Sequence, residues 1–220
     1  MQHFLPVFPL PNVVLFPGGL LSLHIFEPRY KAMIRAALKS DKTIGMVLLK
    51  DGWEANYHGD AAVEAIGCAG LIEVYEKLPA GRFNILLRGT TRFAVEKLCP
   101  TQCWRSAEVV LLPEKDFPYT DAEKGRLYRH MREKIVAYFG TVLCHTSTLH
   151  RMMLAEQDPG ILLNRAIMLL DIDVRTRYEL LQLDELEKRY TFFVQIIDER
   201  LKTRVLAHGL KNIPFDEHTN

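Results

Sequence analysis

The stretch LPAGRFNILLRGTTRF, residues 78–93, decides the fold of this chain. It begins with a proline and a glycine, a pairing typical of a turn, so we expect residues 78–82 to connect two strands as a hairpin. Apolar residues over 83–88 predict the return strand, and Gly89-Thr90-Thr91 is expected to break it before it continues over 92–96. The stretch therefore predicts a half of the chain that is built from strands and tight turns.

Short apolar runs on both sides of this stretch extend the strand-rich half. Together with 83–96 they predict seven β segments, the other six being residues 5–10, 13–15, 20–25, 44–49, 65–75 and 106–112. Prolines in the first run indicate an edge segment, because proline cannot donate to a sheet ladder. One helix is expected to open at Pro28, since proline suits the first helical position, where its missing N–H costs nothing. Seven short strands and one helix predict a small, strongly bent barrel or pseudo-barrel.

The second half changes from strand to helix patterns. Residues 121–139 place apolar side chains on one helical face, and Asp158 before Pro159 is a typical start for a helix over 160–170. Asp173 and Asp184 are expected to cap two further helices, over 174–183 and from about 185 to 205. Four helices of this length predict a C-terminal bundle, with a frayed tail from residue 209.

Three groups of residues resemble the amino-terminal domain of the Lon protease family. The first group is Phe8-Pro9-Leu10, Leu15-Phe16-Pro17-Gly18 and Leu23-His24-Ile25-Phe26-Glu27-Pro28-Arg29-Tyr30. The second is Gly81 to Phe93, and the third is Leu180-Leu181 before Asp184 with Arg189 in the following helix. The first two groups match in order and spacing, and the three together cover roughly residues 4–205.

This resemblance implies an α+β fold, in which a PUA-like β pseudo-barrel with one short helix is followed by a C-terminal α-helical bundle. We place the barrel lobe at residues 1–118, the bundle lobe at 119–208 and a flexible tail at 209–220. In Lon proteases the corresponding region helps to recognise unfolded or tagged substrates and supports the assembly. Free-standing bacterial versions and cereblon-type relatives also exist.

Composition and charge exclude several classes of protein. The chain has 220 residues, 48% of them hydrophobic and 25% charged, which is an ordinary globular mixture. Its 28 basic and 27 acidic residues leave a net charge of +1, whereas dedicated polyanion binders usually carry a basic footprint. The first residues lack the pattern of a signal peptide, and no window is long and apolar enough to span a membrane. We therefore expect a cytoplasmic protein whose four cysteines are free thiols.

The motifs that carry catalysis or bind cofactors are missing from the sequence. It contains neither the G-x-x-x-x-G-K-[ST] phosphate loop nor the G-x-S-x-G nucleophile elbow. Cys99 and Cys103, or Cys144 with His145 and His150, have spacings that zinc tolerates, but no second matched pair follows. His24 is more simply a core or boundary residue than a ligand. We expect no enzyme activity, no metal and no cofactor.

The candidate binding residues are aromatic. Phe8, Phe16, Phe26 and Tyr30 could form an exposed apolar groove, although apolar residues at strand spacing usually pack inside a barrel. Six residues of the matched motifs are interpreted as structural anchors: Glu27, Arg29, Arg88, Gly89, Arg92 and Phe93. We expect Glu27 to cap the first helix and an arginine of the second motif, Arg92, to pair with it.

The leading functional hypothesis is a non-catalytic protein-binding module that holds unfolded or partner polypeptide segments in a groove between barrel and bundle. Burial of apolar side chains would supply the affinity, with an open strand edge as a second term. Such a patch binds weakly, so a homo-oligomer or a tethered partner would strengthen it. The alternative is a small RNA-binding module, since PUA-like folds include RNA binders, with Arg82, Arg88, Arg92 and Arg105 as its basic residues. A third hypothesis is a small-ligand pocket or an unrecognised hydrolase, which would show a convergent polar pocket.

Overall fold

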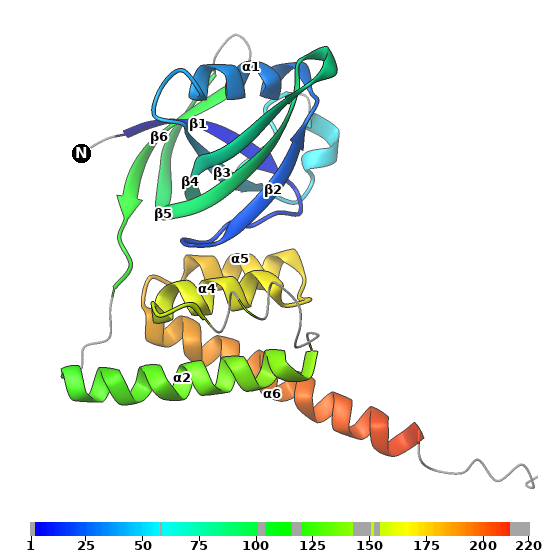
Figure 1. Ribbon diagram of the computed structural model, residues 1–220. Coiled ribbons are helices and arrows are strands. Elements are labelled where there is room, and N and C mark those ends of the chain that lie inside the picture. Colours follow the sequence, from blue (N-terminus) through cyan, green and yellow to red (C-terminus); the bar gives the residue numbers. More distant parts are fainter. Residues whose placement is uncertain are drawn as a thin grey trace, which may run out of the picture.

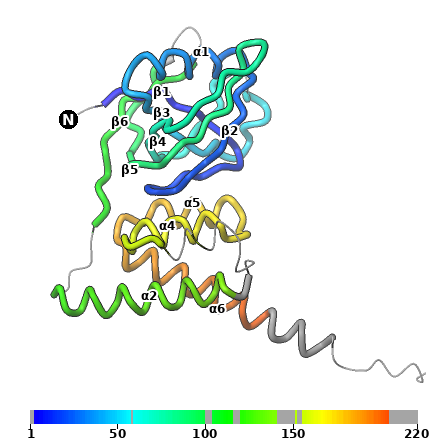
Figure 2. The backbone as a smooth tube through the Cα atoms, viewed as in Figure 1, coloured from blue at the N-terminus to red at the C-terminus, as the bar shows by residue number. Residues whose placement is uncertain are grey.

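The computed structural model describes residues 3–57, 59–100, 104–115, 120–142, 151 and 155–211. The strand-rich half lies on a layer of helices, and the long α6 runs out from beneath them (Figures 1 and 2). The strands are β1 His3–Leu10, β2 Leu20–Ile25, β3 Thr43–Leu49, β4 Val63–Leu78, β5 Arg82–Pro100 and β6 Arg105–Leu112. The helices are α1 Pro28–Ala37, α2 Asp121–Val142, α4 Pro159–Leu169, α5 Val174–Gln182 and α6 Leu186–Lys211, with 3₁₀ turns η1 Trp53–Asn56 and η2 Pro79–Gly81.

The six strands form one mixed sheet in the order β2-β5-β4-β3-β1-β6, and β6 also pairs with β5. Five strands therefore make a continuous hydrogen-bonded circuit, β5-β4-β3-β1-β6, which the long β5 both opens and closes. Among the six described strands, the β1–β3 pair alone is parallel. β2 lies outside the circuit and pairs with the first half of β5 alone. The α+β prediction is confirmed as a mixed sheet with a helical C-terminal half.

Two sequence expectations about the strands are wrong. Residues 13–15 form no strand, because Val14 turns into the core between sheet and helices instead of joining a ladder. β5 runs without a break through Gly89-Thr90-Thr91 and takes up the irregularity itself as a bulge, because its residues Thr90 and Thr91 lie opposite the single residue Ala69 of β4. Strand extension along two neighbours outweighs the local turn preference of glycine here. Six strands therefore stand where seven were expected.

The expected helix starts at Pro28, Asp158 and Asp173 are confirmed, whereas Asp184, expected to cap the last helix, lies two residues before α6 and pairs with Lys115. Pro28 occupies the first turn of α1, and Glu27 is its N-cap residue. Asp158 accepts a hydrogen bond from the backbone N–H of Ile161, and Asp173 accepts one from that of Thr176, so both carboxylates bind otherwise unsatisfied donors. α6 continues to Lys211, so the tail predicted from residue 209 is helical over its first three positions. The predicted lobe boundary at residue 118 lies outside the described residues.

One hydrophobic cluster spans the sheet and the helices. Phe16, Val14 and Leu48 of the strand-rich half share it with buried residues of α2, α4, α5 and α6. A second cluster packs α1 against β2, β4 and β5, and a smaller third fills the space around Phe93. Packed side chains fill the space where this shared cluster lies, and a surface groove between the two halves stays a prediction.

Candidate functional site

The matched sequence motifs meet where the sheet rests on the helices. In the turn after Phe16, the backbone N–H of Gly18 donates to Gly89 at 2.9 Å, and the N–H of Gly89 donates to Gly19 at 2.9 Å. Gly18 has φ +74°, a conformation that favours glycine. A Cβ at Gly89 would lie 2.0 Å from the carbonyl oxygen of Phe16, so only glycine allows the two backbones to approach this closely.

Helix α4 holds this turn from below. The side-chain amide of Asn164 donates to the carbonyl of Pro17 at 3.1 Å, and Arg165 donates to the carbonyl of Gly18 at 2.9 Å. Asn164 is fully buried, and it makes two hydrogen bonds, one to Pro17 and one with Arg189. These bonds offset the free energy lost when its polar atoms leave water. These contacts fix the first motif to the helices.

Two buried arginines bind the C-terminal end of α5. Arg92 of β5 donates to the carbonyl of Leu181 at 3.0 Å, and Arg189 of α6 donates to those of Leu180 and Leu183. The last carbonyls of a helix have no partner within it and carry partial negative charge, so two guanidinium groups satisfy and stabilise them. Glu114 forms an ion pair with Arg189. Burial, followed by the neighbouring Arg189 cation, lowers the pKa of Arg92.

We call this region the joint and define it by Gly18, Gly89, Arg92, Asn164 and Arg189. It contains Gly89 and Arg92 of the predicted anchors, and Phe93 follows as a fully buried core residue. Arg88 lies apart from it and forms an ion pair with Glu73 on the sheet surface. Most donors of the joint are aimed at backbone carbonyls, and the remaining ones bind Asn164 and Glu114.

The expected pairing of Glu27 with Arg92 is wrong. Glu27 accepts hydrogen bonds from Arg29 and from the Tyr57 hydroxyl, each at 3.0 Å, and makes no side-chain cap. Arg29 also donates to the carbonyl of Tyr57 and stacks on the rings of Tyr30 and Tyr57. Burial and the hydrogen bond to Glu27 raise the pKa of Tyr57. The cluster ties the segment after η1 to the start of α1, and no motif in the sequence indicated the role of Tyr57.

Three of the four aromatic residues predicted to bind a partner are core residues. Phe8 and Tyr30 pack against each other, with ring centroids 4.1 Å apart, and Phe16 is fully buried in the shared cluster. A groove formed by all four is therefore wrong, for the reason that apolar residues at strand spacing normally point inward. Phe26 differs, since it is 60% exposed and stacks on the His24 ring. Its binding role stays a prediction.

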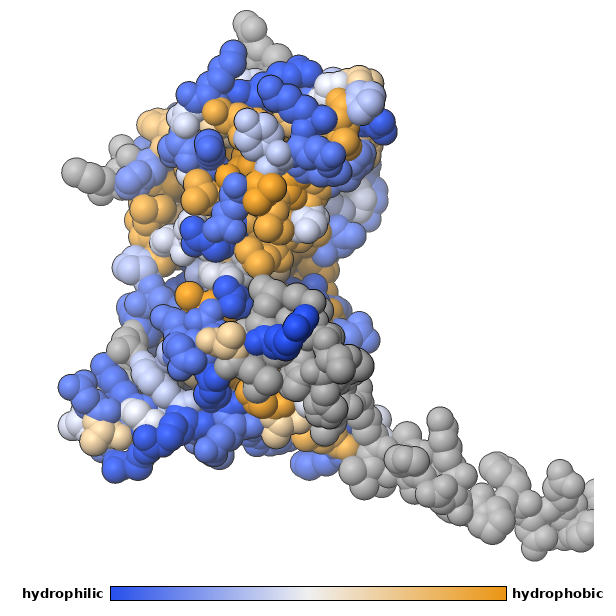
Figure 3. Space-filling model, in the orientation of Figure 1, coloured by the Kyte–Doolittle hydropathy of each residue, from blue (hydrophilic) through white to orange (hydrophobic). Residues whose placement is uncertain are grey.

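An exposed, partly apolar surface lies next to Phe26, on the side of the His24 ring. We call it the outer sheet face and define it by six residues that line one side of the sheet, together with Phe26: Ser22 and His24 of β2, Leu86 and Asn84 of β5, and Val74 and Glu76 of β4. Cross-strand register places Ser22, Leu86 and Val74 in one row and His24, Asn84 and Glu76 in the next. Figure 3 shows apolar side chains gathered on the strand-rich half in the region of β2 and β5.

The two rows of the outer sheet face differ in chemistry. In the polar row, Asn84 joins His24 at 2.8 Å and Glu76 at 3.0 Å, so its side chains satisfy one another. In the apolar row, Val74 is 59% exposed and contacts a half-buried Leu86. No described strand pairs with the far edge of β2, which leaves backbone donors and acceptors available beside this row.

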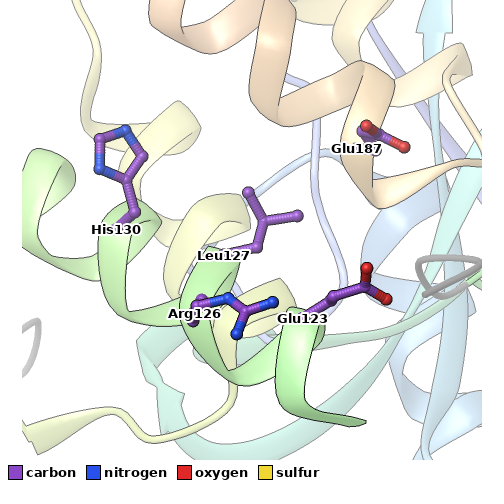
Figure 4. A pocket seen from close by; sticks show the side chains of 5 residues that line it. All are labelled: Glu123, Arg126, Leu127, His130 and Glu187. Carbon is purple, nitrogen blue, oxygen red and sulfur yellow. The ribbon is translucent and has the colours of Figure 1, made fainter. Parts of the chain in front are cut away.

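A shallow pocket, separate from the outer sheet face, lies between the first turns of α2 and α6. It is lined by Glu123, Arg126, Leu127, His130 and Glu187, with the three charged side chains and the imidazole arranged around Leu127 (Figure 4). Glu123 accepts hydrogen bonds from the N–H and hydroxyl of Thr120, which lower its pKa and cap α2. The pocket contains no nucleophile beside a base, so its residues give no arrangement for hydrolysis.

The histidine and cysteine residues that the sequence offered as possible ligands have the following positions in the structure. His24 is exposed and contacts Asn84 and Phe26. Cys68 is buried and Cys99 half-buried, and both are free thiols, while Cys103, Cys144, His145 and His150 lie outside the described residues. Within the described part of the chain, no cluster of three metal-ligating side chains occurs, and no helix is long and apolar enough to cross a membrane.

The arginines named for RNA binding do not form a common patch. Arg92 is buried in the joint, Arg88 pairs with Glu73, and Arg105 donates to the carbonyls of Gly59 and Ala61. Only Arg82 keeps most of its guanidinium directed to solvent, with one hydrogen bond to the carbonyl of Pro79. No feature of the described residues favours the RNA hypothesis.

The fold and the joint define a class of protein that comparison with known families identifies. The model of the ATP-dependent protease La (LON) substrate-binding domain matches residues 4–199. The chain therefore belongs to the LON substrate-binding domain family, as its motifs predicted.

Individual relatives agree with this assignment. Lon protease 2 of Herpetosiphon aurantiacus is 25% identical over 212 residues, which are 94% of this chain and 25% of the relative. Lon protease of Parabacteroides distasonis is 29% identical over 63% of this chain and 17% of its own length. The chain thus spans about a quarter or less of the Lon proteases that it matches.

Solved structures give the same fold. The crystal structure of a Lon N-terminal domain protein from Xanthomonas campestris superposes with a TM-score of 0.62 at 28% identity, covering 88% of this chain and 98% of that one. The N-terminal domain of the Mycobacterium avium complex Lon protease gives a TM-score of 0.69 at 16% identity, over 89% and 98%. The second likeness concerns the fold alone.

Proposed function

We propose that this chain is a non-catalytic, Lon-like recognition module that binds unfolded or partner polypeptide segments on its outer sheet face. The observation that carries the proposal is the exposed apolar row beside the unpaired edge of β2, in a chain of the LON substrate-binding family. We further propose that the strand circuit is a PUA-like pseudo-barrel, that the C-terminal helices form a bundle, and that the protein is cytoplasmic.

The mode of binding follows from the two kinds of group on the outer sheet face. An extended segment could add to β2 as a further strand, because backbone N–H and C=O groups on that edge can pair with any sequence. The added strand would lie beside β2 and Phe26, and a continuation of the segment across the face would contact Leu86 and Val74 on the next two strands. Backbone pairing gives affinity without sequence selectivity, whereas the apolar row selects segments with exposed apolar residues. This combination suits a protein that recognises unfolded chains.

The affinity of a single contact should be weak. The apolar row is short, and ordering a flexible segment costs free energy that a small area of contact only partly offsets. Assembly into a homo-oligomer, or tethering to a partner, would raise the effective affinity by letting several copies hold one polypeptide.

The test measures binding of a reduced and alkylated, permanently unfolded polypeptide by fluorescence anisotropy. We compare the intact chain with the double variant Phe26→Ser/Val74→Ser, which removes the two most exposed apolar side chains of the outer sheet face. The matched control is Phe4→Ser/Val110→Ser, which removes exposed apolar side chains from β1 and β6 instead. We expect the first variant to weaken binding several-fold and the control to leave it unchanged.

Salt separates this proposal from the RNA alternative. Apolar capture changes little between low and moderate salt, whereas phosphate contacts weaken steeply. Equal binding by both variants, or recovery of RNA that disappears after nuclease treatment, would contradict the proposal.

A further inference from the structure

The opposite side of β4 carries a second, chemically different surface. Successive residues of a strand point to opposite faces, so Tyr75 and Lys77 lie on the side away from Val74 and Glu76. There they face the C-terminal part of α1, which lies beside the tip of the β4–β5 hairpin (Figure 1). We call this surface the basic groove and define it by Arg35, Leu38, Lys39, Tyr75, Lys77 and Arg82.

The basic groove concentrates positive charge that forms no ion pair with a carboxylate of the described residues. Arg35 comes from α1, Lys39 from the turn just after it, Lys77 from β4 and Arg82 from the start of β5, and all four are exposed. Acidic residues nearby have other partners: Glu73 pairs with Arg88, Glu76 with Asn84, and Asp41 accepts from the backbone of Thr43. Among the described residues, none of Arg35, Lys39 and Lys77 has an ion pair. The net charge of the whole chain is only +1, so this excess of positive charge is confined to the region of the groove.

The walls and edge of the basic groove favour a polypeptide as the occupant. Tyr75 is 43% exposed and Leu38 is half-buried, so the groove offers apolar contact between the cations. β3 pairs with β4 only as far as Leu71, and the backbone N–H of Ile72 donates to Lys42. Beyond this point, no described strand pairs with that edge of β4 as far as Leu78. An open edge recognises a peptide backbone, which a nucleic acid lacks.

From this placement we propose that the basic groove binds an extended, acidic polypeptide segment, with carboxylates against the four cations and an apolar side chain against Tyr75. The site is separate from the outer sheet face, because it uses the other side of β4. It rests on the proposed function only in taking a polypeptide as the partner. A segment that reached around the hairpin tip could contact both surfaces.

The experiment measures binding of a labelled ten-residue peptide that alternates Glu with Leu and Ser, by fluorescence anisotropy at low salt. Its partner peptide replaces every Glu with Gln and so keeps shape and polarity without charge. The variant Arg35→Glu/Lys39→Glu/Lys77→Glu reverses three cations of the basic groove. The control variant Lys50→Glu/Lys97→Glu/Lys202→Glu makes the same change in net charge at exposed lysines elsewhere.

We expect the acidic peptide to bind the intact chain about three- to tenfold more tightly than the Gln peptide, as two or three partly exposed ion pairs allow. The groove variant should lose this preference, and the control variant should keep most of it. Equal affinity for the two peptides, or equal loss in both variants, overturns the proposal. So does a single-stranded RNA oligomer that binds more tightly than the peptide and loses its binding in the groove variant alone. Binding of the unfolded polypeptide at the outer sheet face, tested with Phe26→Ser/Val74→Ser, can fail or succeed independently of these outcomes.

Discussion

The joint and the outer sheet face treat their polar groups in opposite ways. In the joint, two buried guanidinium groups and a buried amide bind backbone carbonyls and so fix the geometry, while Nε and Nη2 of Arg92 have no hydrogen-bond partner among the described residues. On the outer sheet face, polar side chains satisfy one another at the surface while apolar side chains and a strand edge remain open. The joint is built for one arrangement, and the face is available to partners. The predictions below test this division.

The largest effect is expected from Arg189→Met. This change leaves Glu114, the side chain of Asn164 and the carbonyls at the end of α5 without their donor. Each buried acceptor left without its donor costs about 1–3 kcal/mol, so the loss at Asn164 and at the two α5 carbonyls should total about 3–5 kcal/mol, whereas Glu114 is partly exposed and regains water. The free energy of unfolding, measured with urea, should fall by that amount. Lys188→Met is the control, since its exposed pair with Glu185 contributes at most about 1 kcal/mol. Equal effects of the two variants would show that the joint is not a special region.

The next largest effect is expected from Gly89→Ala. Its Cβ would lie 2.0 Å from the Phe16 carbonyl oxygen, and backbone on both sides would have to separate. Overpacking of this kind costs about 1–3 kcal/mol, and a rigid backbone obstacle favours the upper end. Gly125→Ala in α2 is the matched control, because nothing lies within 4 Å of the added methyl. There the better helix propensity of alanine should stabilise by up to about 1 kcal/mol. A lower free energy of urea unfolding for Gly89→Ala together with a higher one for Gly125→Ala would sharpen the contrast between joint and surface. No change for Gly89→Ala would contradict it.

The same comparison shows what the sequence could predict. Periodicity and capping residues indicated most strands and four helices, because these signals are local. The break at Gly89 was predicted wrongly, since its glycine serves a close approach of two distant backbones rather than a turn. The partner of Arg92 was missed for a related reason: its acceptors are carbonyls of α5, about ninety residues away, and carbonyls leave no trace in a sequence.

The binding surface was harder to predict than the joint. Motifs common to the family pointed to residues that hold the fold, such as Arg92 and Arg189. Alternation in β4 could have suggested that Val74 and Glu76 share a face, but nothing local indicates that β2 has an unpaired edge. Exposure of Phe26 depends on the turn of the chain into α1, which only the tertiary structure fixes.

A smaller effect is expected from pH, through the buried thiol of Cys68 beside Arg92. Burial raises the pKa of this thiol from 9.0 to about 12. Between these values the unfolded chain loses the thiol proton while the folded chain retains it, so stability falls as the pH rises above 9. One such group contributes up to about 1.4 kcal/mol per pH unit. In urea unfolding at pH 8, 9 and 10, the free energy of unfolding should fall more steeply with pH for the intact chain than for Cys68→Ala. Both chains have the same tyrosines, so the difference in slope comes from the thiol. Equal slopes would mean that Cys68 is accessible to solvent and the nearby joint is open.

The smallest effect on stability is expected on the outer sheet face. Phe26 and Val74 are about 60% exposed, so Phe26→Ser/Val74→Ser removes side chains that bury little surface on folding. Surface substitutions of this kind change the free energy of unfolding by about 0.5 kcal/mol or less. The same variant is expected to weaken polypeptide binding several-fold with little change in stability. A joint variant such as Gly89→Ala is expected to lower the free energy of unfolding. Thermal unfolding and anisotropy on the same preparations measure both quantities. A loss of stability comparable to that of Gly89→Ala would show that the outer sheet face is part of the structural core. Side chains that stay exposed after folding contribute little to the free energy of unfolding.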